Sequence, residues 1–94
     1  MKFGWDQGKA DENLKVHRVT FEEAQEVFRD PKAMDFLDPV HSRPEERRYN
    51  IIGFSSRRLL FVAYAELPDR TIWLVSARKA EAKYRRLYEE ENRP

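Results

Sequence analysis

Cysteine is absent from the 94 residues of this chain, which excludes a disulfide framework and a thiolate zinc site. No apolar run approaches the roughly 18 residues that a membrane span needs. The N-terminus also lacks the apolar core of a signal peptide. A P-loop, a dinucleotide-binding fingerprint and a GxSxG nucleophile elbow are all missing, which disfavours NTP, NAD and α/β-hydrolase chemistry. These absences predict a soluble cytoplasmic protein without a cofactor.

Histidine is scarce, with only two in the chain, and their spacing is not that of an HExxH-type metal motif. The sequence therefore predicts no metal site. His17 follows Leu14 by three positions at the end of a predicted helix. It is either a partly buried residue near the helix's C-terminal carbonyls or a general acid/base or phosphate binder. His41 lies in a proline-bounded loop, where a turn-stabilising hydrogen bond is expected ahead of catalysis.

Charged residues, by contrast, are abundant: they make up 37% of the chain, against about 25% in an average protein. The length predicts one domain, residues 1–94, with a largely ionic surface. Residues 1–46 contain seven basic and eleven acidic side chains, whereas residues 47–94 contain eleven basic and six acidic ones. The basic half suits a polyanion, and the acidic half suits a basic partner.

The apolar pattern predicts an α+β fold with the order β-α-α-β-β-β-α and a mainly antiparallel sheet packed with helices. Asp6 is a good N-cap for a helix through about Lys15, whose apolar face would carry Ala10 and Leu14. Thr20 opens a capping box and a second helix, which Pro31 ends. The predicted strands are residues 2–5, 46–53, 59–65, which is expected at the sheet centre, and 70–75, with residues 33–37 as a candidate for another.

The last helix is predicted over residues 77–91, which places Arg78 and Lys79 in its first turn. The helix dipole disfavours cations there. Either an external anion such as phosphate binds at this point, or both side chains are solvated surface charges. Lys79, Lys83 and Arg86 recur at i, i+4 and i+7 and would form a basic stripe on one side of this helix.

Two arginines and two tryptophans are further candidates. Arg48 on one predicted strand and Arg78 beyond the last strand are placed to converge on one phosphate, which a planar guanidinium binds bidentately. Glu46 is either a proton acceptor or an ion-pair partner. Trp73 is predicted in the core, whereas Trp5 either packs in the core or stacks on a base.

Several different short motifs follow one another along nearly the whole chain. They are Phe3-Gly4-Trp5-Asp6 with Lys9 and Asn13-Leu14, Lys15-Val16-His17, Val19-Thr20-Phe21-Glu22-Glu23-Ala24, Asp38-Pro39-Val40-His41-Ser42, Glu46-Arg47-Arg48-Tyr49 with Ile52-Gly53, Ser76-Ala77-Arg78-Lys79-Ala80, and Arg85-Arg86 with Tyr88-Glu89. Each motif alone is weak, but together they resemble the BrnT toxins of bacterial type II toxin–antitoxin systems.

The resemblance implies a RelE-like α+β fold and a ribonuclease that inhibits growth by cutting RNA. It also implies neutralisation by a BrnA-type antitoxin, a ribbon-helix-helix DNA-binding protein encoded beside the toxin, and repression of their own operator DNA by the complex. The chain departs from the family pattern at four places, one of which is the connection Ser55-Ser56-Arg57-Arg58, which lacks the glycine often seen there. Arg18 stands where a glycine is usual, Glu81 where a threonine is common, and Tyr84 where a glutamate is common.

The implied mechanism is metal-independent attack of the ribose 2′-OH on its own phosphate. His17 or Glu46 is the expected base, Arg48 and Arg78 are the expected phosphate clamps, and His41 is a reserve proton carrier. The expected RNA contacts are Lys9, Trp5, Lys79, Lys83 and Arg86. The alternatives are a non-catalytic module that binds nucleic acid or protein through the last helix, and a chain that functions only as a repressor with its partner. Convergence of His17, Arg48 and Arg78 in one cleft with Lys79 would favour the enzyme.

Overall fold

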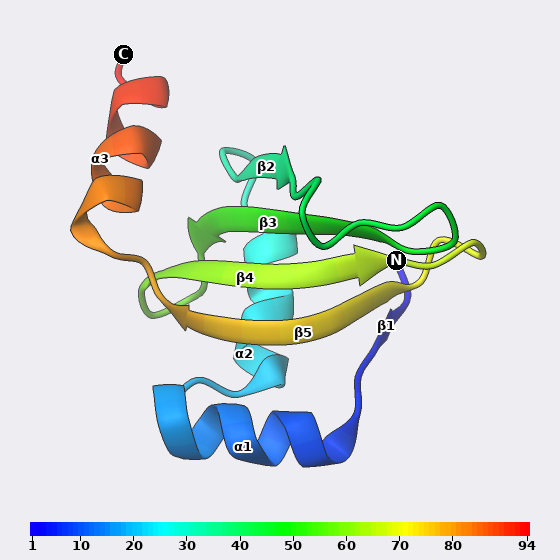
Figure 1. Ribbon diagram of the computed structural model, residues 1–94. Helices are drawn as coiled ribbons and strands as arrows, with labels where there is room; N and C mark the ends of the chain where they lie inside the picture. Colours follow the sequence, from blue (N-terminus) through cyan, green and yellow to red (C-terminus); the bar gives the residue numbers. More distant parts are fainter.

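A five-stranded sheet in the order β1-β5-β4-β3-β2 forms the centre of the protein, which is described here by a computed structural model of residues 1–94 (Figure 1). The elements in chain order are β1 (Phe3–Gly4), α1 (Gln7–His17), α2 (Phe21–Glu26), the 3-10 helix η1 (Val27–Arg29), β2 (Met34–Leu37), β3 (Arg47–Phe54), β4 (Leu59–Glu66), β5 (Ile72–Lys79) and α3 (Ala82–Glu91).

The sheet confirms the predicted fold class. Strands β2 to β5 pair antiparallel with their neighbours, and only β1 pairs parallel, with β5. The apolar strand β4 is central, as predicted. The candidate strand at residues 33–37 is present as β2, so the predicted order gains one strand.

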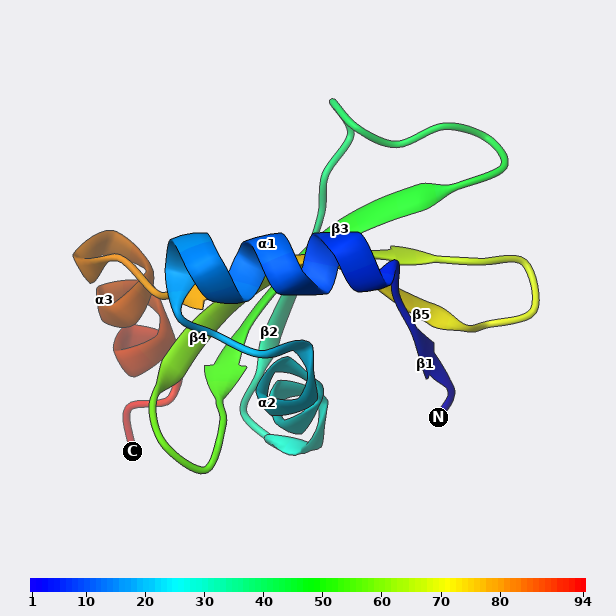
Figure 2. The same cartoon turned by 90° about the horizontal axis from the view of Figure 1, so that it is seen from below.

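Helices cover the two faces of the sheet unequally. In Figure 1, α2 lies behind the sheet and α1 runs along β5, whereas α3 stands at one end. Figure 2 shows the loop between β2 and β3 projecting to the side opposite α2. The main core lies on the α2 side and includes Phe21, Val62 and Leu74, and a smaller cluster of Ile52, Leu59 and Tyr88 holds α3. No helix is both long and apolar enough to cross a bilayer.

The first two helices begin where the sequence predicts. The Asp6 carboxylate accepts a hydrogen bond from the Lys9 N–H at 2.9 Å, and the Thr20 hydroxyl accepts one from the Glu23 N–H at 3.0 Å. Helix α1 ends at His17 and is capped by Arg18, whose φ of 60° is the left-handed conformation that glycine usually supplies. Leu14 is 47% exposed, so the predicted apolar face was wrong there.

The predicted start of the last helix was also wrong. Strand β5 continues through Lys79, because it pairs with the whole of β4, and Arg78 lies opposite Phe61 in that ladder. Helix α3 begins only after Glu81, its N-cap residue. Residues 76–80 contain good helix formers, but sheet pairing overrides this weak preference. Arg78 and Lys79 are therefore strand residues, and the argument for an anion at a helix N-terminus does not apply to them.

The structure corrects the expectation for Trp73 and decides between the two alternatives for Trp5. Trp73 is only partly buried and lies outside the main core, on the sheet face opposite Leu74. Trp5 packs against the core, with its ring 5.8 Å from that of Phe21 in an edge-to-face contact.

Candidate active site

The sheet face turned away from α2, which we call the open face, carries most of the candidate residues. Strand alternation places Arg48 and Asn50 of β3 on it, beside Ala63 of β4. On β5 a bulge decides which side chains reach this face. Ala63 pairs with Ser76 and Tyr64 with Leu74, so Val75 has no partner.

This bulge is what places Arg78 on the open face. Strict alternation from the buried Leu74 would turn Arg78 toward the core, because residues of equal parity share a face. The extra residue shifts the pattern by one, so Ala77 is buried and Arg78 lies beside Phe61 on the open face. Bulges are over-represented next to active sites for this reason.

His41 forms a dyad with Asp38 in the loop before β3. The His41 Nδ1 lies 2.8 Å from the Asp38 Oδ2, and the other carboxylate oxygen accepts bonds from the Val40 and His41 N–H groups at 3.2 and 3.4 Å. These bonds, above all that from the His41 ring, lower the pKa of Asp38. An ionised carboxylate only accepts, so Nδ1 carries the proton that is shared with Asp38, and Nε2 is the ring nitrogen that this bond leaves available.

Arg48 lies next to this dyad. Asp38, His41 and Arg48 line one cavity of about 230 Å³ on the open face. His41, Arg48 and Glu46 also line a second cavity of about 260 Å³. The Arg48 Nε donates to the Glu46 carboxylate at 3.1 Å, and both side chains are about one-third exposed (30% and 32%). The structure thus unites three predicted site residues, with Glu46 held as the ion-pair partner of Arg48.

Ser42 fixes the loop against β3. Its hydroxyl donates to the Asp38 carbonyl at 2.7 Å and accepts from the Arg48 N–H at 2.9 Å. The dyad and the arginine are therefore held by one shared side chain. Sequence reasoning gave neither Asp38 nor Ser42 a role, although an aspartate three residues before a loop histidine is a recognisable signal for an Asx-type turn.

Arg78 lies at the α3 end of the open face. Its guanidinium carbon is 4.9 Å from the centre of the Phe61 ring, and one terminal nitrogen is 3.3 Å from the Glu81 carboxylate. Its Nε is buried without a hydrogen-bond partner. The Phe61 ring also contacts Tyr84 of α3, with 4.6 Å between centroids, so Arg78 belongs to the contact that joins α3 to the sheet.

His17 lies elsewhere, in a cavity of about 170 Å³ between α1 and β5. Lys9, Val75 and Ser76 are among the other residues that line it. Val75 also lines the cavity that contains His41, so the two cavities adjoin at the bulge.

The expected basic stripe does not exist as one helical surface. Lys79 is an exposed residue at the end of β5, whereas Lys83 and Arg86 are exposed on α3. The Lys83 ammonium lies 5.0 Å from the centre of the Tyr84 ring.

The predicted site residues therefore do not meet in one cleft. Arg48 and Arg78 lie opposite Ala65 and Phe61 on the two sides of β4. The two arginines are offset by four residues along the strand direction and by two strand spacings across the sheet. Standard strand geometry then puts their Cα atoms about 16 Å apart. This separation fits contacts with two different phosphates, and the clamp of both arginines on a single phosphate stays a prediction.

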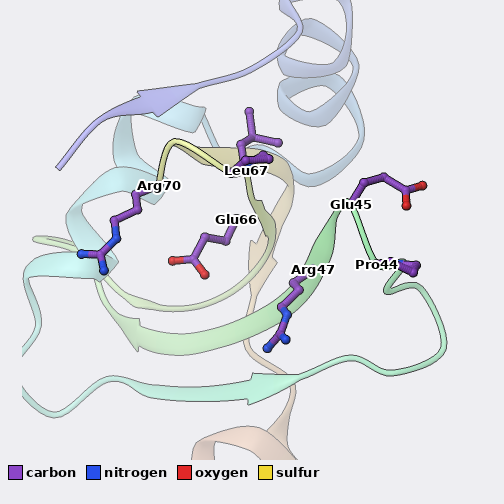
Figure 3. A pocket seen from close by; sticks show the side chains of 7 residues that line it. Pro44, Glu45, Arg47, Glu66, Leu67 and Arg70 are labelled. Atoms are coloured by element: carbon purple, nitrogen blue, oxygen red, sulfur yellow. The ribbon is translucent and has the colours of Figure 1, made fainter.

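The largest hollow lies away from these residues, at the turn end of the sheet (Figure 3). It has a volume of about 430 Å³ and is lined by Arg47, Arg70 and Glu66, among others. Figure 3 shows Glu66 between the two arginines. None of the predicted site residues lines it. No group of three or more acidic, histidine or cysteine side chains is placed to hold a metal ion.

The fold itself is that of a bacterial toxin. The crystal structure of the Brucella abortus ribonuclease toxin BrnT matches this chain with a TM-score of 0.65 and 20% sequence identity. The match covers 86% of this chain and 97% of that chain. A search of curated proteins finds no match.

A family profile makes the assignment more specific. The profile described as "Ribonuclease toxin, BrnT, of type II toxin-antitoxin system" matches residues 5–83. The chain therefore belongs to the BrnT family of ribonuclease toxins, which confirms the resemblance drawn from its motifs.

Proposed function

We propose that this chain is an endoribonuclease that cuts RNA on the open face of its sheet without a metal ion. The observation that carries the proposal is the dyad of Asp38 and His41 beside Arg48. It combines a histidine of fixed tautomer with a guanidinium, the two kinds of group that proton transfer and phosphate stabilisation need.

The reaction is attack by the ribose 2′-OH on the adjacent phosphorus. His41 Nε2 takes the 2′-OH proton, the oxygen–phosphorus bond forms, and the bond from phosphorus to the 5′-oxygen breaks. The 5′-oxygen takes up a proton through solvent water, to which His41 returns the proton it had accepted, and the products are a 2′,3′-cyclic phosphate and a 5′-hydroxyl end. Arg48 stabilises the charge that develops on the phosphorane oxygens.

The other expected residues take supporting places in this proposal. Glu46 orients Arg48 and is less suited to be the base, because its carboxylate already accepts from the Arg48 Nε. Arg78, about 16 Å away by strand geometry, contacts a different phosphate of the same RNA. Lys9 and His17 border the adjoining cavity, and Lys79, Lys83 and Arg86 supply sequence-independent attraction at the α3 end. Trp5 is better suited to packing than to base stacking.

Family membership supports a proposal for the partners. We propose an antitoxin of the BrnA type that neutralises this chain in the cytoplasm, and a complex of the two that binds and represses its own operator DNA. Membership in a type II toxin–antitoxin family supports a protein antitoxin and an RNA substrate.

A second candidate is a non-catalytic module that binds RNA or protein. It is favoured by the separation of His17, Arg48 and Arg78, which do not share a cavity. Incubation of the purified chain with RNA in EDTA separates the two. We expect cleavage that persists in EDTA and leaves 2′,3′-cyclic phosphate ends. The control is a His41→Ala protein that is purified in the same way. Binding without cleavage would support the module, and cleavage that a divalent ion must restore would refute the mechanism.

A further inference from the structure

The two edges of the sheet differ in how they are closed. At the β5 edge, β1 pairs with Ile72 and Trp73, and the Asn13 side chain of α1 bonds both the N–H and the carbonyl of Ala77. At the other edge, β2 pairs only with β3. One edge is therefore covered by a strand and a helix, and the other is open.

The outer side of β2 presents unpaired main-chain groups. The Asp38 N–H donates to the Arg48 carbonyl at 2.8 Å, so these two residues occupy the position of a hydrogen-bonded pair, although the Arg48 N–H donates to the Ser42 hydroxyl instead. Such pairs alternate along an antiparallel ladder. The main-chain N–H and carbonyl of Phe36 therefore also face β3. The main-chain N–H groups of Asp35 and Leu37 point outward and are free to bond an added strand.

Apolar side chains flank this edge on both faces of the sheet. Phe36 and Leu37 are 37% and 53% exposed, and alternation places them on opposite faces. Val40, just beyond the strand, is 84% exposed. Lysine, proline and bulges, which protect many natural edge strands, do not occur within Met34–Leu37.

The charge around the edge selects the kind of partner. Residues 30–46 contain five carboxylate side chains and only two lysines or arginines. A polyanion such as RNA is repelled from such a surface, whereas a peptide with alternating apolar and basic residues complements it.

We propose that the outer edge of β2 is the docking site of the antitoxin, which adds an extended apolar and basic segment as a sixth strand of the sheet. This inference rests on the proposed function, because it takes the partner to be the antitoxin of this toxin. Strand β2 leads directly into Asp38 and His41. A segment that continues past Leu37 therefore covers the loop that carries the dyad, which couples binding to neutralisation.

Amide hydrogen exchange tests the edge without any substitution. The chain is compared alone and in complex with the co-expressed product of the neighbouring antitoxin gene. We expect the outward amides of Asp35 and Leu37 to exchange at least about 10-fold more slowly in the complex. The amide of Phe36, already bonded to β3, is the internal control and should change less. A stable complex in which Asp35 and Leu37 still exchange as in the free chain overturns the proposal.

Substitutions at Leu37 supply the second test. Leu37→Pro removes one outward N–H while leaving the bonds to β3 in place, and should weaken antitoxin binding by about 10-fold or more in calorimetry. Leu37→Lys keeps the N–H but adds charge to the edge, and Leu14→Lys at a comparably exposed position of α1 is its matched control. The Leu14 variant should bind like the parent chain.

The remaining outcomes show whether the antitoxin, RNA or a second copy of the chain binds the β2 edge. RNA cleavage by Leu37→Pro should equal that of the parent, and loss of cleavage with unchanged antitoxin affinity would assign the edge to RNA and overturn the proposal. A dimer of the free chain that Leu37→Pro converts to monomer would assign the edge to a second copy, with the same consequence. If the parent chain cuts no RNA but Leu37→Pro still weakens the antitoxin complex, the proposed ribonuclease fails and the docking site stands.

Discussion

At the scale of single residues, the structure changes which histidine is the better proton carrier. His41 is oriented by Asp38 and shares a cavity with Arg48, whereas the His17 ring has no hydrogen-bond partner in the protein and lies in another cavity. A catalytic histidine needs a fixed tautomer and a nearby stabiliser of negative charge, and only His41 has both. We therefore rank His41 above His17, which reverses the ranking that the sequence suggested.

The first prediction tests this ranking. His41→Ala should lower kcat for RNA cleavage by about 10²- to 10⁴-fold, the usual scale for one acid–base group. His17→Ala should lower kcat by less than about 10-fold. Asp38→Asn should fall between them, since it keeps the turn but weakens control of the tautomer. Equal loss in the two histidine variants would contradict the assignment.

The two arginines should differ in what their loss does to folding. Arg48→Ala and Arg78→Ala should each lower cleavage by about 10²-fold if each contacts a phosphate in the transition state. Arg78→Ala should also lower the melting temperature by a few degrees, because it removes the contacts with Phe61 and Glu81 that hold α3.

A lysine at position 48 separates the effect of the positive charge from that of the planar guanidinium. Arg48→Lys keeps the charge but loses the bidentate fork, so it should recover only part of the activity. If Arg48→Ala instead lowers the melting temperature and leaves the cleavage rate unchanged, the ion pair between Arg48 and Glu46 is structural. Arg48 is then not a phosphate contact.

At the scale of elements, local patterns predicted most of the fold. N-caps at Asp6 and Thr20 located two helices, and a wholly apolar run located the central strand. The start of α3 was missed because residues 76–80 have no property that distinguishes a strand end from a first helical turn. Pairing with β4, whose partners lie 13 to 19 residues earlier in the sequence, decides it. The bulge at Val75 was missed for the same reason, since a bulge is a property of two strands in register.

The site could be predicted only as a set of residue types. Glu46, Arg48 and His41 were predicted and do lie together, because β3 and the loop before it are adjacent in sequence. Asp38 and Ser42 were given no role, since their bonds depend on how the loop folds back on β3. The spacing between Arg48 and Arg78 depends on the strand register, which no local pattern specifies.

The Asn13 side chain joins α1 to the sheet, so its removal tests how much this contact between elements stabilises the fold. It is 5% exposed, donates to the carbonyls of Val19 and Ala77, and accepts from the Ala77 N–H at 2.9 Å. Asn13→Ala should destabilise the fold by about 2–4 kcal/mol, because it leaves several buried groups without partners. Urea unfolding measures this, with Leu14→Ala at the neighbouring exposed position as control. A loss below about 0.5 kcal/mol would mean that water replaces the amide.

At the scale of the whole molecule, charged side chains occupy both faces of the sheet. Helix α2, with Glu22 exposed on it, covers one face, while Arg48 and Arg78 lie on the other. The sides are joined by carboxylates that bond across the fold. Asp30 accepts from the Phe54 N–H and from the Tyr88 hydroxyl, which connects η1 to β3 and α3. Burial and this bond raise the pKa of Tyr88 to about 12.

These carboxylates make the stability of the fold depend on pH. Bonds from Arg58 and Ser55 outweigh burial and lower the pKa of Glu23. At Asp30 burial acts to raise the pKa, but bonds from the Phe54 and Lys32 N–H groups and from Tyr88 outweigh it, so the pKa is lowered. A carboxylate whose pKa is lower in the folded state contributes stability above its unfolded pKa and loses it as pH falls through the folded value. The fold should therefore be stable at neutral pH and lose stability below about pH 4–5.

Glu23 provides the sharpest test of this dependence. Its side chain is 8% exposed, and its carboxylate accepts from the Arg58 Nε and terminal nitrogen at 3.0 and 2.8 Å and from the Ser55 hydroxyl at 2.7 Å. Glu23→Gln should cost about 2–3 kcal/mol at pH 7, the scale for hydrogen bonds to a charged group. That cost should shrink as pH falls below about 4, because Glu23 of the unfolded chain then becomes protonated and the native ion pair contributes less to stability. Urea unfolding at pH 7 and pH 3.5 measures both values, with Glu22→Gln as the exposed control on the same helix. A cost that stays constant between the two pH values would mean that Glu23 acts through its shape and not through its charge.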